Sequence, residues 1–100
     1  MKVTFTPLAE RQLDDLYEYV ATRADPARAD AFVGRIVAYC ETLKTFPQRG
    51  HKRDDVVPGL RIIGFERRVT IAFIVTADAV LIEGILYGGR DILGAFRAAD

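Results

Sequence analysis

The stretch AVLIEGILYGGRD, residues 79–91, decides the fold because it is the most strand-like segment of the chain. Its first nine residues are mostly β-branched or otherwise apolar, a composition typical of a strand inside a sheet. Gly88 and Gly89, which disfavour continuation of a strand, mark its end, and Tyr87 and Arg90 supply polar groups there. We therefore expect a central strand whose end carries the best candidate site residues, Tyr87 and Arg90.

Two more β-segments, residues 60–66 and 69–75, precede this strand. They are separated from each other by Arg67-Arg68, and the second is separated from residue 79 by three residues. Connections this short join antiparallel neighbours, so the sequence predicts three consecutive antiparallel strands. The Arg67-Arg68 turn lacks the glycine or Asn-Gly pair that tight hairpins prefer, and its geometry stays open.

Two helices are predicted upstream of these strands. Thr6-Pro7 and Asp25-Pro26 each place an N-cap residue before a proline at the first helical position. The second helix is expected to run from Pro26 to about Lys44, and the short connection predicts an antiparallel hairpin. Residues 2–6 alternate as a short strand, and residues 47–59 have the composition of a loop. The expected buried stripes are Ala9, Leu13, Leu16, Tyr17 and Val20 in the first helix, and Ala29, Phe32, Val33, Ile36, Val37, Cys40 and Leu43 in the second.

This order of elements predicts an α+β fold in one domain, residues 1–100. It comprises an N-terminal strand, a helical hairpin on one face of an antiparallel sheet, and a short C-terminal helix containing Ile92, Leu93 and Phe96. In the last strand Val80, Ile82 and Leu86 are expected to face the helices. An apolar second face is then left for a partner or for the folded-back C-terminal segment. Its expected members are Arg61, Ile63, Phe65, Ile74, Glu83, Ile85 and Tyr87.

Composition limits the function classes. The net charge is zero, although residues 44–68 hold seven basic side chains against three acidic ones. A single cysteine and a single histidine offer no metal-ligand spacing and no disulfide, so we expect no metal and no cofactor. The longest apolar run is far shorter than the roughly 20 residues that span a bilayer, and no charged-then-apolar leader begins the chain. These features predict a cytoplasmic protein that does not engage membranes.

The basic zone admits two interpretations. Arginine and lysine side chains together with one tyrosine on a sheet face could neutralise RNA phosphates and stabilise the transition state of metal-free RNA cleavage. The plainer interpretation is that Lys52, Arg53, Arg67 and Arg68 form a solvated rim or pair with acidic groups of a protein partner. His51 lies in a charged loop and is expected to be solvated, and Cys40 is expected to be a core residue.

Nearly the whole chain resembles the ParE toxins of the RelE/ParE superfamily, the toxin halves of type II toxin-antitoxin modules. The resemblance is carried by FTPLAERQLDDLYEYVA, DPARADAFVGRIVAYCETLKTFPQRG, VPGLRIIGFERRVTIAFIV and VLIEGILYGGRDI, in this order and spacing. It implies a small toxin held inactive by an antitoxin whose C-terminal segment wraps around it, and DNA contact only through that antitoxin. The implied antitoxin-binding residues are Arg61, Ile63, Phe65, Ile74 and Ile85.

Members of this superfamily have two kinds of target. ParE-like toxins are understood to inhibit DNA gyrase, whereas RelE-like toxins cleave messenger RNA on the ribosome. The RelE-like pattern includes an arginine on the strand at residues 69–75, and this strand has no arginine. We therefore expect a gyrase-binding toxin without catalytic chemistry, with Arg61, Tyr87 and Arg90 binding the target. A RelE-like endonuclease using Lys52, Arg53, Arg61 and Tyr87 is the alternative, and a module that only pairs with its antitoxin is a third.

Overall fold

The computed structural model describes residues 1–88 and contains two long helices and five strands. The predicted C-terminal helix and Arg90 lie outside the described residues. The predicted helices and the three main strands are confirmed with small shifts at their ends. In chain order the elements are β1 (Lys2–Phe5), α1 (Pro7–Arg23), α2 (Pro26–Thr42), β2 (His51–Lys52), β3 (Leu60–Phe65), β4 (Val69–Val75) and β5 (Ala79–Tyr87).

The five strands form one mixed sheet in the order β1-β5-β4-β3-β2. The prediction of a purely antiparallel sheet is wrong at β1, which pairs parallel with β5. The intervening helical hairpin supplies the long crossover that a parallel pair requires. β2 falls within residues 47–59, where only a loop was expected, and pairs antiparallel with β3. Two residues are too few to leave an alternating pattern in the sequence.

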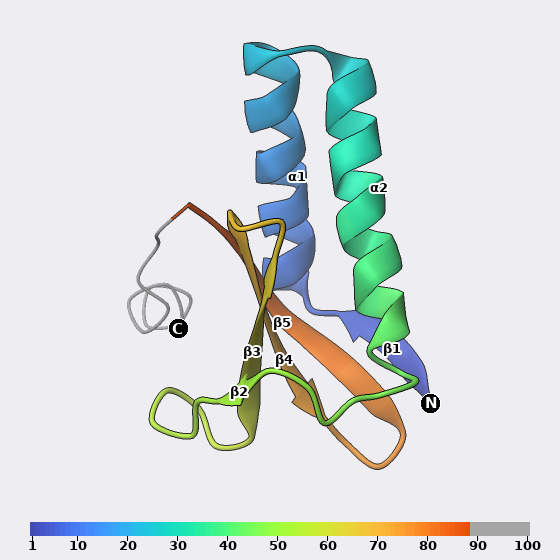
Figure 1. Cartoon of the computed structure of the whole chain (residues 1–100), viewed down its shortest axis with the longest axis vertical. Coiled ribbons are helices and arrows are strands. Elements are labelled where there is room, and N and C mark those ends of the chain that lie inside the picture. Colours follow the sequence, from blue (N-terminus) through green and yellow to red (C-terminus); the bar gives the residue numbers. More distant parts are fainter. Residues whose placement is uncertain (89–100) are drawn as a thin grey trace.

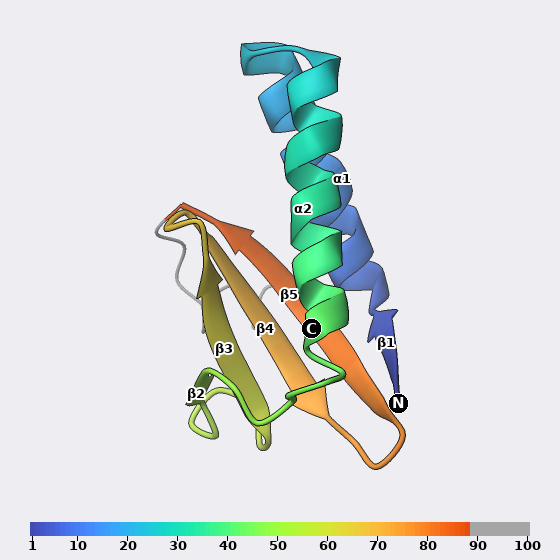
Figure 2. The ribbon, with the colours of Figure 1, turned by 45° about the vertical axis from the view of Figure 1, so that its right-hand side comes forward.

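Both helices begin at the predicted caps. The Thr6 hydroxyl accepts a hydrogen bond from the Ala9 amide at 3.2 Å, and the Asp25 carboxylate accepts one from the Arg28 amide at 2.8 Å. The hairpin lies on one face of the sheet, and its far half extends beyond the strands (Figures 1 and 2). One face of the sheet is thus covered by helices, as the element order predicted.

The core lies between the hairpin and this face of the sheet. Phe73, Ile71 and Ile82 are fully buried at its centre, and Ile36 and Leu43 enter it from the second helix and its end. The buried members of the core are Ala9, Leu16, Ile36, Cys40, Leu43, Val69, Ile71, Phe73, Val80, Ile82 and Ile85.

A β-bulge in β5 changes which side chains face the helices. β4 pairs Phe73 with Ile82 but its neighbour Ala72 with Gly84, so Glu83 is an extra residue in β5. Beyond it the alternation is shifted by one position, as in any strand that gains a residue. Ile85 therefore joins the helix-covered core, contrary to the sequence-based expectation. Tyr87 also packs on that side and Leu86 turns to the other, so both expectations were wrong.

The expected faces of β3 are also reversed. Ile63 pairs with Ile71, and Phe65 pairs with Val69, which places both with the helix-covered core. Arg61 shares this side through its pairing with Phe73. The sequence analysis placed Arg61, Ile63 and Phe65 on the face away from the helices because Arg61 makes this row less uniformly apolar. Arg61 is tolerated because it is only partly buried and is hydrogen-bonded by the loop after α2.

The second face of the sheet is nevertheless apolar, as predicted, although most of its members differ. Ile74 keeps its expected place there, paired with Leu60 and Leu81. Ile62, Ile74 and Leu81 are half-buried, whereas Leu60 is fully buried. The apolar side chains of this face are Leu60, Ile62, Ala72, Ile74, Leu81 and Leu86.

The turn between β3 and β4 resolves the geometry that the sequence left open. Glu66 and Arg67 both adopt positive φ, at 48° and 66°, which non-glycine residues seldom do. The Glu66 carboxylate accepts two hydrogen bonds from the Arg35 guanidinium of α2, at 2.8 and 3.0 Å. This bidentate contact ties the strained turn to the helical hairpin.

Candidate functional site

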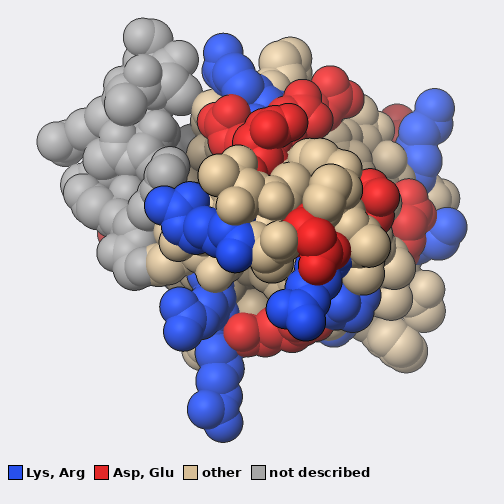
Figure 3. All heavy atoms as spheres, turned by 90° about the horizontal axis from the view of Figure 1, so that it is seen from above, with Lys and Arg blue, Asp and Glu red and all other residues tan. Residues whose placement is uncertain are grey.

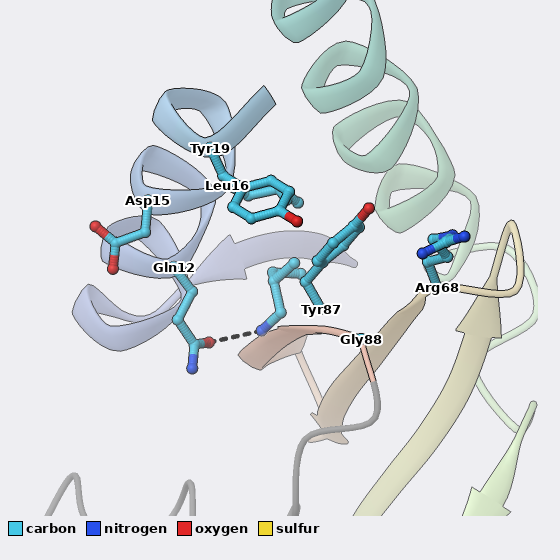
Figure 4. A pocket seen from close by; sticks show the side chains of 8 residues that line it. Gln12, Asp15, Leu16, Tyr19, Arg68, Tyr87 and Gly88 are labelled. Atoms are coloured by element: carbon cyan, nitrogen blue, oxygen red, sulfur yellow. Dashed lines mark hydrogen bonds between the residues drawn. The ribbon is translucent and has the colours of Figure 1, made fainter. Parts of the chain in front are cut away.

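A pocket of about 390 Å³ opens between α1 and the end of β5 (Figure 4). Its size lies within the range of about 300–1,000 Å³ typical of ligand pockets. The end of β5, including Tyr87, forms part of its lining. The lining residues are Gln12, Asp15, Leu16, Tyr19, Arg68, Ile85, Tyr87 and Gly88.

One wall of the pocket is a single face of α1. Gln12, Asp15, Leu16 and Tyr19 follow the spacing i, i+3, i+4, i+7, which brings side chains into one row on a helix. The Gln12 side-chain oxygen accepts a hydrogen bond from the backbone amide of Ile85 at 2.7 Å (Figure 4). Gln12 therefore links the helix directly to the main chain of β5.

Aromatic contacts fix the position of Tyr87. Its ring lies 5.4 Å from that of Tyr19, tilted by 54°, and 6.3 Å from that of Phe32 in an edge-on arrangement. Both separations lie in the range that favours aromatic pairs. The Arg23 guanidinium sits 3.8 Å from the centre of the Tyr19 ring, within cation-π distance. Tyr87 is thus packed between both helices and is not a free strand end.

The pocket is bordered by charges of both signs. The Asp15 carboxylate lies on the α1 side, and the Arg68 guanidinium lies on the opposite side, beyond Tyr87 (Figure 4). Seen from above, acidic and basic side chains are interspersed over this end of the molecule (Figure 3). On the face seen there, the described residues present no continuous basic surface of the kind that neutralises a nucleic acid backbone.

Arg61 belongs to a separate polar group near the other end of the sheet. Its guanidinium donates to the Gln48 side-chain oxygen at 2.6 Å and to the Arg49 carbonyl at 3.4 Å. The Arg49 side chain donates in turn to the Tyr39 hydroxyl at 2.9 Å. Arg61 therefore anchors the loop that joins α2 to β2.

The structure does not bring the proposed nuclease residues together. Lys52 pairs with Arg61 across β2 and β3, whereas Tyr87 pairs with Val69 at the far end of the sheet. Arg61 pairs with Phe73, four residues along β4 from Val69, which is a separation of about 13 Å at about 3.3 Å per residue.

Arg53 does not complete such a set either. Its guanidinium makes two hydrogen bonds of 2.9 Å to the Asp55 carboxylate. This contact holds the pKa of Asp55 below its ordinary value. Because each guanidinium is already engaged and Tyr87 is distant, the four residues form no single catalytic arrangement.

Two other ionisable groups are shaped by burial. Burial, with a smaller contribution from Glu41, raises the pKa of the Cys40 thiol to about 12, in line with its predicted place in the core. Burial also raises the pKa of the Glu83 carboxyl at the bulge.

Within residues 1–88, no group of three or more histidine, cysteine, aspartate or glutamate side chains is arranged to hold a metal ion. In the same part of the chain, neither helix has the length and apolar character needed to cross a membrane.

Comparison with known proteins places this arrangement in a class. A chain from a solved structure titled "Chromosomal ParDE TA system from P. aeruginosa" superposes with a TM-score of 0.77. The two sequences are 27% identical over 88% of this chain and 96% of the other. The fold is therefore that of a toxin-antitoxin component. No match was found among curated proteins.

The family follows from the sequence profile. Residues 3–92 match the family described as "ParE toxin of type II toxin-antitoxin system, parDE". The protein belongs to this family of ParE toxins, as the resemblance in the sequence indicated. Membership in a toxin-antitoxin family implies an antitoxin as partner.

Sequence reasoning found one side of the pocket and missed the other. Tyr87 was singled out from the strand end, but Gln12 and Tyr19 were assigned to no site. The available signal was a second helical row at 12, 15, 16 and 19 beside the core stripe. It mixes polar and apolar side chains, so hydrophobic periodicity alone does not reveal it.

Proposed function

We propose that this ParE toxin acts by binding DNA gyrase and inhibiting it, without catalysing a reaction of its own. The observation that supports this over RNA cleavage is the separation of Arg61 and Lys52 from Tyr87 on opposite ends of the sheet. A nuclease must gather its cations and its acid or base around one phosphate. A binding protein can instead present separate groups over a wide surface.

The target-binding residues we propose are Tyr87, Arg61 and Arg90. Tyr87 is held by rings from both helices, and Arg61 is held by the loop before β2. Arg90 lies outside the described residues, and its role rests on its place in the sequence two residues after Gly88. Two rigidly held groups would present a preformed surface to a partner, which lowers the entropic cost of binding.

A supercoiling assay with purified toxin and gyrase tests this proposal. We expect stoichiometric toxin to block supercoiling, and we expect Tyr87→Ala and Arg61→Ala to weaken the inhibition. Arg28→Ala is the matched control, because the Arg28 side chain is 78% exposed and its guanidinium lies 3.7 Å from the Asp25 carboxylate, away from Tyr87 and Arg61 in the sequence and in the sheet. Unchanged supercoiling at stoichiometric excess, or codon-boundary cuts in translated messages after brief induction, would contradict the proposal.

We further propose that the cognate antitoxin neutralises the toxin by covering the second face of the sheet. Ile62, Ile74 and Leu81 lie there half-buried, and an apolar surface of this kind favours a protein partner. Of the residues first proposed for this contact, Ile63, Phe65 and Ile85 pack in the core, so Ile74 is the best probe. Ile74→Asp should abolish rescue of gyrase by the antitoxin and leave inhibition intact. Full rescue of this variant would exclude this face.

A further inference from the structure

The second half of β5 has an edge that no strand occupies within residues 1–88. β1 pairs with β5 only from Ala79 to Ile82, and the sheet order places no other strand on that side. From Gly84 to Tyr87, β5 is paired on its β4 side alone. Unpaired backbone groups on a strand edge are a template for another strand.

The hydrogen bonds of β5 show which backbone groups point to this edge. Ile85 donates its amide to the Gln12 side chain, so its pairing with Ile71 is of the type without hydrogen bonds. Two residues on, Tyr87 has the same orientation, because backbone groups alternate between the two edges of a strand. The next amide, that of Gly88, turns to the other edge and donates to the Arg68 carbonyl at 2.8 Å.

The Ile85 carbonyl and the Tyr87 amide therefore both face the pocket edge. Within the described part of the chain, no hydrogen-bond partner is assigned to either group. One residue of an adjacent parallel strand would satisfy both at once, with its N–H donating to the Ile85 carbonyl and its C=O accepting from the Tyr87 amide. The Gln12 side chain already supplies one such substitute, since its amide oxygen accepts from Ile85 as a strand carbonyl would.

The surroundings of this edge have the features of a peptide slot. The pocket of about 390 Å³ lies along it, and Leu16, Ile85 and the Tyr87 ring line it with apolar surface. Arg68 stands at the Gly88 end, with no ion pair to any of residues 1–88. In the same turn, Glu66 is occupied by Arg35 and does not pair with Arg68. The Asp15 carboxylate also lines the pocket but lies on the α1 wall, on the side away from Arg68, so the Arg68 end is the part that favours a carboxylate (Figure 4).

We propose that this edge is a docking slot for an extended, acidic segment of a partner protein. The segment adds as a strand beside Gly84–Gly88, in line with β1, and places a carboxylate against Arg68. Main-chain hydrogen bonds to Ile85 and Tyr87 supply affinity, and the apolar wall and Arg68 select the side chains. The slot is distinct from the second sheet face proposed for the antitoxin, and it does not depend on gyrase as the target.

Nuclear magnetic resonance on the full ¹⁵N-labelled chain tests the slot. The probe is the capped peptide Ac-Val-Thr-Val-Asp-Val-NH2, and the control is a twin with every backbone nitrogen methylated. We expect the probe, but not its twin, to shift the Ile85 and Tyr87 amide resonances and to slow hydrogen exchange at Tyr87. No shift at ~5 mM probe, which excludes even millimolar binding, overturns the proposal. So does an amide of Tyr87 that is already protected from exchange in the free chain.

A charge-matched pair of variants locates the carboxylate. Arg68→Glu should weaken probe binding about tenfold, which corresponds to about 1.4 kcal/mol. Arg67→Glu makes the same change of charge in the same turn, but Arg67 does not line the pocket and should have a much smaller effect. Amide spectra of both variants in the absence of probe report whether each remains folded. Equal losses of binding in the two folded variants would show that general charge, and not the slot, attracts the peptide.

Discussion

Gly50→Ala is expected to destabilise the toxin strongly because two constraints act at this position. Gly50 has φ of +77°, a left-handed conformation that costs a residue with a side chain about 1–2 kcal/mol. A Cβ there would also lie 2.1 Å from the backbone oxygen of Ile62. Because a backbone atom cannot rotate away, relief requires moving β2 from β3, where His51 pairs with Ile62.

The expected cost combines these two effects. Disrupting one or two strand hydrogen bonds adds about 1 kcal/mol each, so the free energy of unfolding should fall by about 3 kcal/mol. Gly59→Ala is the matched control, since Gly59 has φ of +84° but its added Cβ would meet only a Ile74 methyl carbon, at 4.0 Å. It should cost only the conformational term of about 1–2 kcal/mol.

Urea unfolding of the two variants measures the difference. Both midpoints should fall without a change in the slope of free energy against urea, and the fall should be clearly greater for Gly50→Ala. In a chain of this size, each kcal/mol also corresponds to about 4–8 °C in melting temperature. Equal destabilisation by the two substitutions would refute the argument that close contact with Ile62 fixes this loop.

Other predictions follow from the turn, the bulge and the core. Arg67→Gly should raise the free energy of unfolding by up to about 1 kcal/mol in urea titrations, because glycine adopts the positive φ of 66° without strain. The Arg35 hydrogen bond lowers the pKa of Glu66 in the folded chain below its ordinary value of 4.5. The stability that this contact contributes is therefore present above pH 4.5 and is lost as the pH falls through the pKa of the folded state. Burial raises the pKa of Glu83 in the folded chain above its ordinary value of 4.5. Stability is therefore lost as the pH rises from 4.5 through the pKa of the folded state, because the buried carboxyl ionises less readily than the exposed one. In urea titrations at pH 7, Glu66→Gln should therefore destabilise and Glu83→Gln stabilise, with both effects fading at low pH; the same sign for both would contradict this. Alkylation of Cys40, whose thiol pKa is raised to about 12, should proceed only on unfolding and should accelerate with urea; rapid alkylation of the native chain would contradict its burial.

The helices and the order of the three main strands could be predicted because their signals are local. Thr6-Pro7 and Asp25-Pro26 mark helix starts through the chemistry of caps, which acts within one turn. Short connections likewise force β3, β4 and β5 into an antiparallel row. The parallel pairing of β1 is a long-range contact, and nothing in residues 2–5 distinguishes the two directions.

The faces of the sheet could not be predicted from alternation alone. Alternation assumes an unbroken period of two, and the extra residue at Glu83 ends that period in the middle of β5. The glycine that follows it was the available warning, because an isolated glycine within a strand often marks a bulge. The bulge also explains why the α1 side of the pocket was missed: Gln12 and Tyr19 become pocket residues only through the side of β5 that the bulge turns toward them.

The bulge has a consequence for how relatives of this toxin should be compared. A sequence alignment pairs the tyrosines at the ends of two β5 strands even where one strand has the extra residue and the other does not. With one residue fewer, the same tyrosine would emerge on the reverse of the sheet, away from Tyr19 and Arg68. An alignment gap of a single position near Glu83 therefore predicts a toxin that displays its terminal tyrosine to a different partner surface.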